Sequence, residues 1–108
     1  LLQLVAAYQP FLDEGRFWGP SFITKIEDNQ GRVLYTRPSP KSTKVMSDWT
    51  AFQMRSMLNG VVLYGTGRNA NWSGSSSDIG GKTGTTSEYR DAWFVGFFPG
   101  LVTGVWMG

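Results

Sequence analysis

The stretch that decides the fold reads GKTGTT over residues 81–86 and RDAWFVGFFP over residues 90–99. Together the two pieces are rich in threonine and aromatic residues, with glycine and proline near their ends, which is typical of short β-strands joined by turns. We expect three strands, over residues 79–87, 91–98 and 101–107. The middle strand is apolar on both faces, so we expect it to be interior to the sheet and covered on both sides.

The first third of the chain predicts a helix followed by a β-hairpin. Apolar residues recur at helical spacing over residues 1–12, and Gly15 follows as a stop signal. Pro10 lies inside this pattern and should kink or break the helix. Two β-rich runs, residues 22–27 and 32–36, are separated by a polar turn that ends in glycine, so we expect them to pair as a hairpin.

A second helix is expected in the middle of the chain, after a proline-containing loop over residues 38–44. Ser47 is suited to cap its N-terminus. One face of this helix is predicted to be apolar and consists of Met54, Met57, Leu58 and Val61. The turn Gly65-Thr66-Gly67 closes the helix, and the Ser-, Asn- and Gly-rich residues 68–78 are expected to form a mobile surface loop.

Composition limits the kinds of function that the chain can have. It has 108 residues, enough for one modest core, and 15% of them are aromatic, which is typical of a globular protein. Ten basic and eight acidic residues are scattered along the sequence, so we expect no binding of nucleic acid. The sequence has no cysteine and no histidine, which excludes disulfides and the usual general base. We therefore expect no metal and no cofactor, and any acid–base chemistry must use a lysine, a carboxylate or a tyrosine.

The two ends of the sequence predict a fragment. The chain begins at Leu1 inside an apolar pattern and stops inside a strand-like run over residues 102–108. No apolar run approaches the roughly 18 residues that span a bilayer, and there is no signal-peptide pattern. Neither observation excludes export of the longer protein from which we expect this chain to come.

The triplet Gly81-Lys82-Thr83 also occurs in phosphate-binding P-loops. A P-loop needs a further glycine five residues before Gly81, where Ser76 stands, and a helix after the motif. Gly84 and a strand follow here instead, which disfavours a phosphate site. The structural alternative is an exposed edge strand whose lysine serves solubility.

Lys82-Thr83-Gly84, on a predicted strand after Gly80-Gly81 and before Thr85-Thr86, resembles the third active-site motif of the serine acyltransferases that penicillin acylates. The resemblance covers nearly the whole chain, and the run RDAWFVG over residues 90–96 and the hairpin favour the class A penicillin-binding proteins over class B transpeptidases and serine β-lactamases. It implies an α/β (α+β) fold with an antiparallel sheet flanked by helices, a fragment of the penicillin-recognising serine transpeptidase or β-lactamase-like fold. We expect residues 1–108 to be the C-terminal portion of a single transpeptidase domain, with the nucleophile-bearing part absent.

The resemblance assigns roles to residues of the motif strand. It implies that Lys82 is a fixed positive charge that assists proton transfer and attracts the substrate carboxylate. The hydroxyls of Thr83 and Thr85 would bind that carboxylate, and Gly84 would let the substrate backbone approach closely. The Thr85 backbone N–H would be one donor of an oxyanion hole. Because strand side chains alternate, Lys82 and Gly84 should share one face, and we expect the strand to leave one edge open toward a cleft, where an extended peptide can pair.

The family's nucleophile motif, Ser-x-x-Lys, is missing from the sequence. The resemblance therefore implies part of a peptidoglycan D,D-transpeptidase whose acyl-serine forms on a residue outside this chain. The implied partners are the peptidoglycan stem peptide, β-lactam antibiotics and the nucleophile-bearing remainder of the same domain. The implied location is the extracytoplasmic, periplasmic face of the bacterial cell membrane, with the membrane anchor and a glycosyltransferase domain elsewhere in the parent protein. The alternative is a non-catalytic remnant of this fold that binds a peptide or a partner protein.

For several other conspicuous residues we expect a structural role. Ser76-Ser77-Asp78 superficially fits a variant of the family's second motif, but it lies in a loop where the family does not place that motif. Arg90 and Asp91 are expected to pair or to cap a turn, with substrate contact as the alternative. The aromatic residues of the last two strands are expected to form core or sheet faces. Pro10 and the loop over residues 72–77 depart from the family pattern. They lie away from the motif, so they bear on what the resemblance implies about the substrate and not on the family itself.

Overall fold

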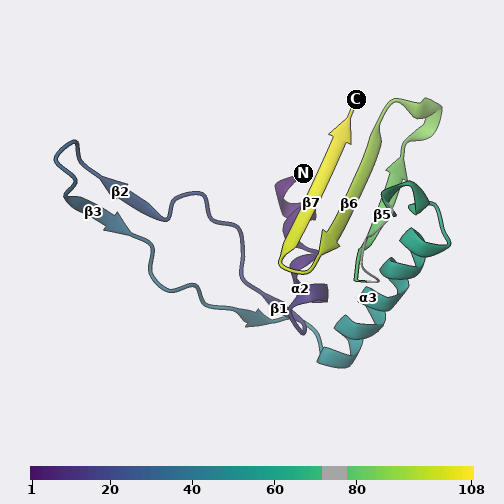
Figure 1. The fold of residues 1–108 in the computed structure, drawn as a ribbon, viewed down its shortest axis with the longest axis horizontal. Coiled ribbons are helices and arrows are strands. Elements are labelled where there is room, and N and C mark those ends of the chain that lie inside the picture. The colour runs from purple at the N-terminus through teal and green to yellow at the C-terminus, as the bar shows by residue number, and fades with distance from the viewer. Residues whose placement is uncertain (72–77) are drawn as a thin grey trace.

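The body of the molecule is a three-stranded antiparallel sheet with helices on one face, and a long arm projects from it (Figure 1). The computed structural model describes residues 1–71 and 78–108. The described elements, in chain order, are α1 (Leu2–Ala6), α2 (Gln9–Leu12), β1 (Arg16–Phe17), β2 (Lys25–Glu27), β3 (Val33–Thr36), β4 (Thr43–Lys44), α3 (Asp48–Leu63), the 3₁₀ turn η1 (Arg68–Ala70), β5 (Gly80–Thr85), the 3₁₀ turn η2 (Ser87–Tyr89), β6 (Ala92–Phe98) and β7 (Leu101–Met107). This arrangement confirms the predicted class, an antiparallel sheet flanked by helices.

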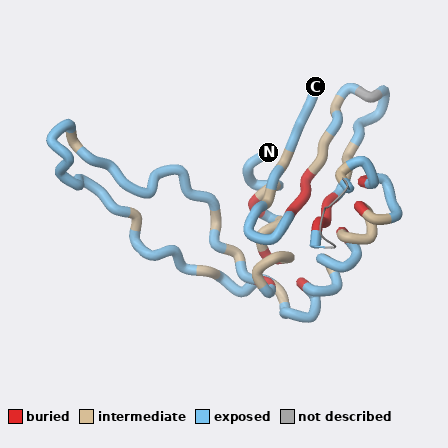
Figure 2. Tube along the Cα trace, in the orientation of Figure 1, coloured by how far each residue is buried: buried red, intermediate tan, exposed pale blue. Residues whose placement is uncertain are grey.

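The sheet has the order β5–β6–β7, so the apolar strand β6 is central, as predicted. Its Val95 and Phe97 are each only 3% exposed, on the face over which α1 packs against β7 and α3 against β5. The prediction that β6 is covered on both sides is wrong for this chain. On the opposite face Phe98 is 44% exposed and Val105 of β7 is 52% exposed, because the described helices gather on the other face (Figure 2).

The N-terminal helical pattern is divided into two short helices. Pro10 occupies the first turn of α2, where its missing N–H is not needed. The helical pattern is therefore interrupted just before this proline, between α1 and α2. Gly15 ends the segment with a positive φ of 79°. A Cβ at Gly15 would collide with the carbonyl group of Met46, so this position requires glycine for close approach as well as for conformation.

Helix α3 begins where predicted, because the Ser47 side chain accepts a hydrogen bond from the Thr50 N–H at 3.1 Å. Its buried face differs from the predicted one. The buried side chains are Ala51, Leu58 and Val62. Met57 was assigned to the apolar face but is 60% exposed, because the helix presents the row of residues 51, 58 and 62 to the sheet.

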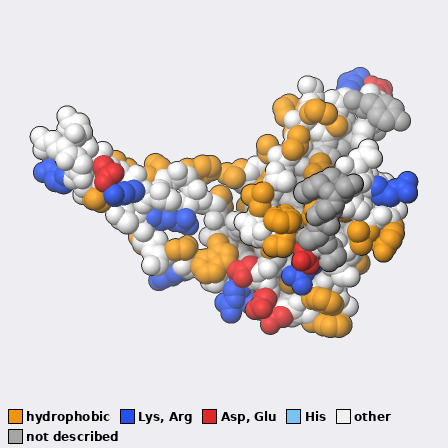
Figure 3. Space-filling model, viewed as in Figure 1, with side chains coloured by type: hydrophobic (Ala, Val, Ile, Leu, Met, Phe, Trp, Pro, Cys, Tyr) orange, Lys and Arg blue, Asp and Glu red, His pale blue; other side chains and the backbone are white. Residues whose placement is uncertain are grey.

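The arm, residues 19–43, carries the predicted hairpin of β2 and β3 well away from the body (Figure 1). Asp28 closes its turn, since its Oδ1 accepts from the N–H groups of Gln30 at 2.9 Å and Arg32 at 2.8 Å. Hydrophobic side chains are visible along the arm (Figure 3). The large ones that are exposed are Phe22, Ile23, Ile26, Val33, Leu34 and Tyr35.

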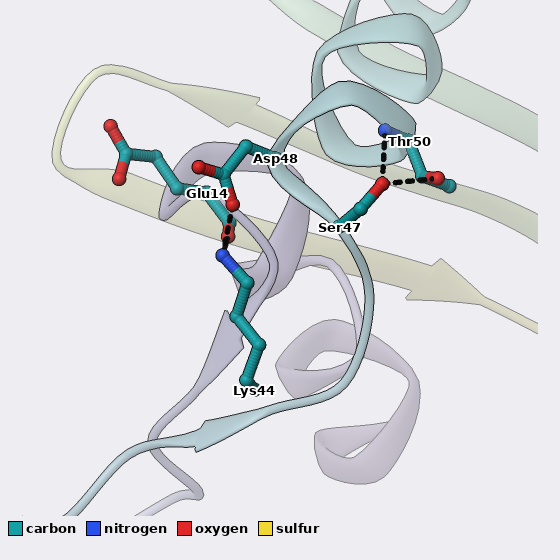
Figure 4. Close-up of polar contacts among 5 residues, drawn as sticks. All are labelled: Glu14, Lys44, Ser47, Asp48 and Thr50. Atoms are coloured by element: carbon teal, nitrogen blue, oxygen red, sulfur yellow. Dashed lines mark hydrogen bonds and ion pairs between the residues drawn. The ribbon is translucent and has the colours of Figure 1, made fainter.

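The base of the arm is closed by a short ladder between β1 and β4. The residues of β4 were expected to belong to the loop over residues 38–44. Lys44 of β4 adds a polar joint beside it (Figure 4). Its ammonium donates to the Glu14 carbonyl at 2.6 Å and forms an ion pair with Asp48 at the start of α3. This joint holds the end of the N-terminal segment, the arm and α3 together.

The predicted loop over residues 68–78 is partly structured, because residues 68–70 form η1. The other predictions for this loop fall mostly on residues 72–77 and lie outside the described residues.

Candidate functional site

The motif strand β5 lies at an edge of the sheet. Its register pairs Lys82 with Val95 and Thr83 with Phe94 of β6. Along the described residues β5 pairs with β6 alone, so the other edge of residues 80–85 is unpaired. The predicted open edge and interior neighbour are therefore confirmed.

Two glycines bring β5 close to the aromatic residues of β6. A Cβ at Gly80 would collide with the ring of Phe97, and one at Gly81 would lie 2.6 Å from the ring of Phe94. At the start of the strand, the Asn59 side-chain amide of α3 donates to the Ile79 carbonyl at 2.7 Å. These contacts fix β5 against both β6 and α3, so the motif is carried on a rigid element.

The polar groups of the motif gather at the open edge. The Lys82 ammonium donates to the Thr83 carbonyl at 2.7 Å and to its hydroxyl at 3.3 Å. The Lys82 side chain is exposed, Thr83 and Gly84 are half-buried, and Thr85 is exposed. All four residues predicted for the site thus lie on β5, whose other edge is unpaired along the described residues.

Thr66, which was expected only to form part of a turn, contacts Lys82 and Thr83, and the three side chains form one polar cluster. Its hydroxyl oxygen lies 3.5 Å from the Lys82 ammonium and accepts from the Thr83 hydroxyl at 3.0 Å. The signal that could have found it is its position between two glycines, Gly65 and Gly67, at the end of the helix that precedes the motif strand.

Arg90 and Asp91 each bond to other residues and not to one another. Arg90 pairs with Glu88 at 2.5 Å on the exposed connection between β5 and β6. The Asp91 N–H donates to the Thr86 hydroxyl at 2.9 Å, and the Thr86 N–H donates to the Asp91 carbonyl at 3.1 Å. The turn-capping role predicted for Asp91 is therefore confirmed.

The cavities that we find lie away from the motif. One of about 540 Å³ lies between the N-terminal helices and β7 and is lined by residues such as Val5, Leu12 and Val102. Another of about 230 Å³ lies on the exposed sheet face beside Phe94 and Phe98. Lys82 lines neither of them, so the cleft expected beside the open edge stays a prediction.

Over the described ranges, no group of three or more His, Asp or Glu side chains is arranged to hold a metal ion. None of the described helices is both long and apolar enough to cross a membrane. Both findings concern residues 1–71 and 78–108 alone.

Comparison with known proteins gives matches along almost the entire chain. The family model of the penicillin binding protein transpeptidase domain matches residues 1–106. Penicillin-binding protein 1A of Aquifex aeolicus is 47% identical over 107 residues, which are 99% of this chain and 14% of that protein. The crystal structure of penicillin-binding protein 1A from Haemophilus influenzae has a TM-score of 0.86 at 30% identity, over 96% of this chain and 21% of that one. The D,D-transpeptidase domain of a peptidoglycan glycosyltransferase from Eggerthella lenta has a TM-score of 0.78 at 29% identity, over 90% of this chain and 23% of that one.

Proposed function

Because this chain belongs to the penicillin-binding protein transpeptidase domain family, we propose that it supplies the substrate-binding strand of a peptidoglycan D,D-transpeptidase. The resemblance to class A penicillin-binding proteins is confirmed by relatives of that kind. The chain spans 14% of the length of the Aquifex aeolicus protein, so the activity belongs to a larger unit. In this proposal the nucleophilic serine lies on a part of the same domain outside these residues, and residues 1–108 are its C-terminal portion.

The observation that carries the proposal is the position of Lys82 and Thr83 at the unpaired edge of β5. An extended peptide that adds to this edge gains main-chain hydrogen bonds, and its terminal carboxylate meets the ammonium and hydroxyls of the cluster. Charge-assisted hydrogen bonds of this kind are stronger than neutral ones, so the cluster favours a ligand with a free carboxylate. A D-Ala-D-Ala stem peptide and a β-lactam both carry one.

The chemistry follows two acyl transfers. The serine oxygen attacks the carbonyl carbon between the two D-Ala residues, the carbonyl oxygen becomes an oxyanion, and the terminal D-Ala leaves with a proton on its amine. An amine of a neighbouring strand then attacks the acyl-serine and forms the cross-link, while the serine regains its proton. With a β-lactam the ring amide opens on the same serine and the acyl-enzyme persists.

Thr85 would stabilise the oxyanion through its backbone N–H. In a strand, the N–H and C=O of one residue point to the same edge, and this direction repeats at every second residue. The Thr83 carbonyl accepts from the Lys82 ammonium, which lies outside the β5–β6 ladder. This contact supports an outward-pointing N–H at Thr85, two residues further along.

The proposal extends to location and partners. We place the parent protein at the extracytoplasmic face of the bacterial membrane, where peptidoglycan is assembled, with its anchor and a glycosyltransferase domain outside this chain. Its partners are the stem peptide, β-lactams and the nucleophile-bearing remainder of the domain. A non-catalytic, peptide-binding remnant of the fold is the alternative, and the same experiment separates the two.

The test is intact-mass measurement after incubation with benzylpenicillin. We expect the parent protein to gain one penicilloyl group per molecule, since β-lactams acylate the serine nucleophile. The isolated 108-residue chain should gain none, because it lacks Ser-x-x-Lys. A parent protein that stays unmodified at saturating penicillin supports the binding remnant, and a stoichiometric adduct on the isolated chain contradicts the assignment of the nucleophile to another part.

A further inference from the structure

The turn after α3 brings a hydroxyl to the motif strand from a distant part of the sequence. Thr66 lies 16 residues before Lys82, yet its Oγ1 is 3.5 Å from the Lys82 Nζ. The same oxygen accepts the hydroxyl hydrogen of Thr83 at 3.0 Å. A hydroxyl has two acceptor lone pairs, so one Thr66 side chain can receive both groups at once.

The backbone on both sides of Thr66 is pinned to the last turn of α3. The N–H groups of Gly65 and Gly67 both donate to the Val61 carbonyl, at 3.0 and 3.1 Å. A Cβ at Gly65 would lie 2.9 Å from the Val61 Cα, and one at Gly67 would lie 3.3 Å from a Val61 side-chain carbon. Gly65 therefore has no room for a side chain, and a side chain at Gly67 would need its neighbours to move by a few tenths of an ångström. Together with the two hydrogen bonds, this close packing restricts the turn that carries Thr66.

The helix that carries this turn is itself anchored to β5. Val62 of α3 is only 1% exposed. The side-chain amide of Asn59, also in α3, donates a hydrogen bond to the Ile79 carbonyl just before β5. Thr66 is therefore tied to β5 through both the packing of α3 and its own hydroxyl. An exposed side chain with this degree of backbone constraint is suited to orient its neighbours.

We propose that Thr66 is a positioning residue for the acylation reaction, and the inference rests on the function proposed above. Its hydroxyl holds the Lys82 ammonium and the Thr83 hydroxyl at the open edge of β5. When a ligand carboxylate takes the single hydrogen of the Thr83 hydroxyl, the Thr66 hydroxyl can donate its own hydrogen to the Thr83 oxygen and keep the contact. Lys82 has three hydrogens to donate, and the chain offers it three acceptors: the Thr66 hydroxyl, the Thr83 hydroxyl and the Thr83 carbonyl. Without Thr66, Lys82 and Thr83 both lose an acceptor and gain rotational freedom.

The experiment measures the second-order rate constant of acylation by a fluorescent penicillin, in the full-length parent protein. Thr66→Val keeps the shape and removes the hydroxyl, and we expect it to slow acylation about tenfold, which corresponds to the loss of one hydrogen bond to a charged group. Thr66→Ser restores the oxygen and should return the rate to within about twofold of wild type. Thr36→Val, on the arm, is the matched control and should leave the rate unchanged, and the melting temperature of all three variants should be close to wild type.

A double-mutant cycle with Thr83→Val separates positioning from a merely structural effect. If Thr66 acts through its contacts with Thr83 and Lys82, Thr66→Val should slow the Thr83→Val variant by a smaller factor than it slows wild type, because one of the two contacts is already gone. Losses that multiply would overturn the inference, as would a Thr66→Val rate within about twofold of wild type. Should Thr66→Val fold poorly, Thr66→Ala is judged by the same criteria.

The controls also keep this inference distinct from the proposed function. A wild-type protein that is not acylated, or a Lys82→Ala variant as fast as wild type, removes the proposed function and this inference with it. Normal acylation that needs Lys82 but is indifferent to the Thr66 hydroxyl removes the inference alone.

Discussion

Trp106 donates its indole N–H to Oδ1 of Asp91 across 2.9 Å, which ties β7 to the connection between β5 and β6. The other carboxylate oxygen of Asp91 accepts from the Thr86 hydroxyl at 3.2 Å. The Asp91 side chain therefore connects the last strand with the residue that follows β5. The Asp91 carboxylate thus adds a side-chain link to the β5–β6 and β6–β7 ladders, which set the order of the strands.

Asp91→Ala should destabilise the domain by about 0.5–1.5 kcal/mol, because it removes the hydrogen bonds that Trp106 and Thr86 donate to the carboxylate and water replaces it at these exposed groups. Asp91→Asn keeps an oxygen for Trp106 and should cost less. The free energy of unfolding, followed by tryptophan fluorescence in urea, measures both effects. Equal stability of Asp91→Ala and wild type would contradict the structural role.

Lys82→Ala in the parent protein should slow acylation by β-lactams roughly a hundredfold or more, the range for losing a positioned acid–base or electrostatic group. The side chain is exposed, so the melting temperature should change little. Lys41→Ala, an exposed lysine on the arm, is the control for the loss of a positive charge and should react like wild type. An acylation rate of Lys82→Ala within about threefold of wild type would remove its assigned role.

Thr83→Val and Thr85→Val test recognition of the ligand carboxylate. Each substitution keeps the shape and removes one hydroxyl, and each should weaken ligand binding by about 1.5–3 kcal/mol, as for hydrogen bonds to charged groups. The measurement compares two β-lactams that differ in the carboxylate. The loss should be much smaller for the ligand without it, and equal losses on both ligands would contradict carboxylate binding.

Much of the fold followed from the sequence because its signals are local. The strands of the sheet are rich in threonine and aromatic residues and end at turn residues, Ser47 caps α3 as expected, and Pro10 interrupts the first helical pattern. The β1–β4 ladder gives no such signal, since each strand contributes two residues and they pair across the whole arm. The buried face of α3 differs from the predicted one because the helix has many apolar residues, and helical spacing then fits more than one face. Packing against β5 selects one of these faces.

The part of the site that belongs to one contiguous sequence motif was predicted. Lys82, Thr83, Gly84 and Thr85 are contiguous, and their placement at an edge follows from the apolar neighbour strand. Thr66 was not predicted as part of the site, because its position between two glycines indicates a turn and does not by itself indicate a contact with the motif strand. Its contact with Lys82 depends on the tertiary packing of α3 on β5.

The ion pair between Lys44 and Asp48 at the base of the arm predicts how the stability of the fold depends on pH. The hydrogen bond from Lys44, with the positive charge of that group, holds the pKa of Asp48 below its ordinary value. A lowered folded-state pKa stabilises the fold above the unfolded-state pKa, and this contribution is lost as the pH falls through the folded-state value, below about pH 4. Lys44→Met should raise the pKa of Asp48 toward its ordinary value in an NMR titration of the carboxyl carbon. Lys41→Met should not, and an Asp48 titration that is indifferent to Lys44 would contradict the joint.

Gly84 and Gly81 give a matched pair that tests ligand approach against folding. A Cβ at Gly84 would meet only the Trp93 Cβ, at 3.4 Å, which is an ordinary contact. A Cβ at Gly81 would lie 2.6 Å from the Phe94 ring and 2.9 Å from the Val95 carbonyl oxygen, which the sheet cannot accept without moving.

Gly84→Ala should therefore leave the melting temperature unchanged or slightly higher, since alanine has less conformational freedom to lose on folding. It should nevertheless slow acylation at least about tenfold, because the added methyl group occupies space where a ligand backbone must approach the strand edge. Gly81→Ala should lower the melting temperature by several degrees, as expected for about 1–3 kcal/mol of overpacking. If Gly84→Ala reacts with penicillin as fast as wild type, the ligand does not approach this part of β5. If both variants lose stability to the same extent, the effect of Gly84→Ala on acylation reports folding and the close-approach model is wrong.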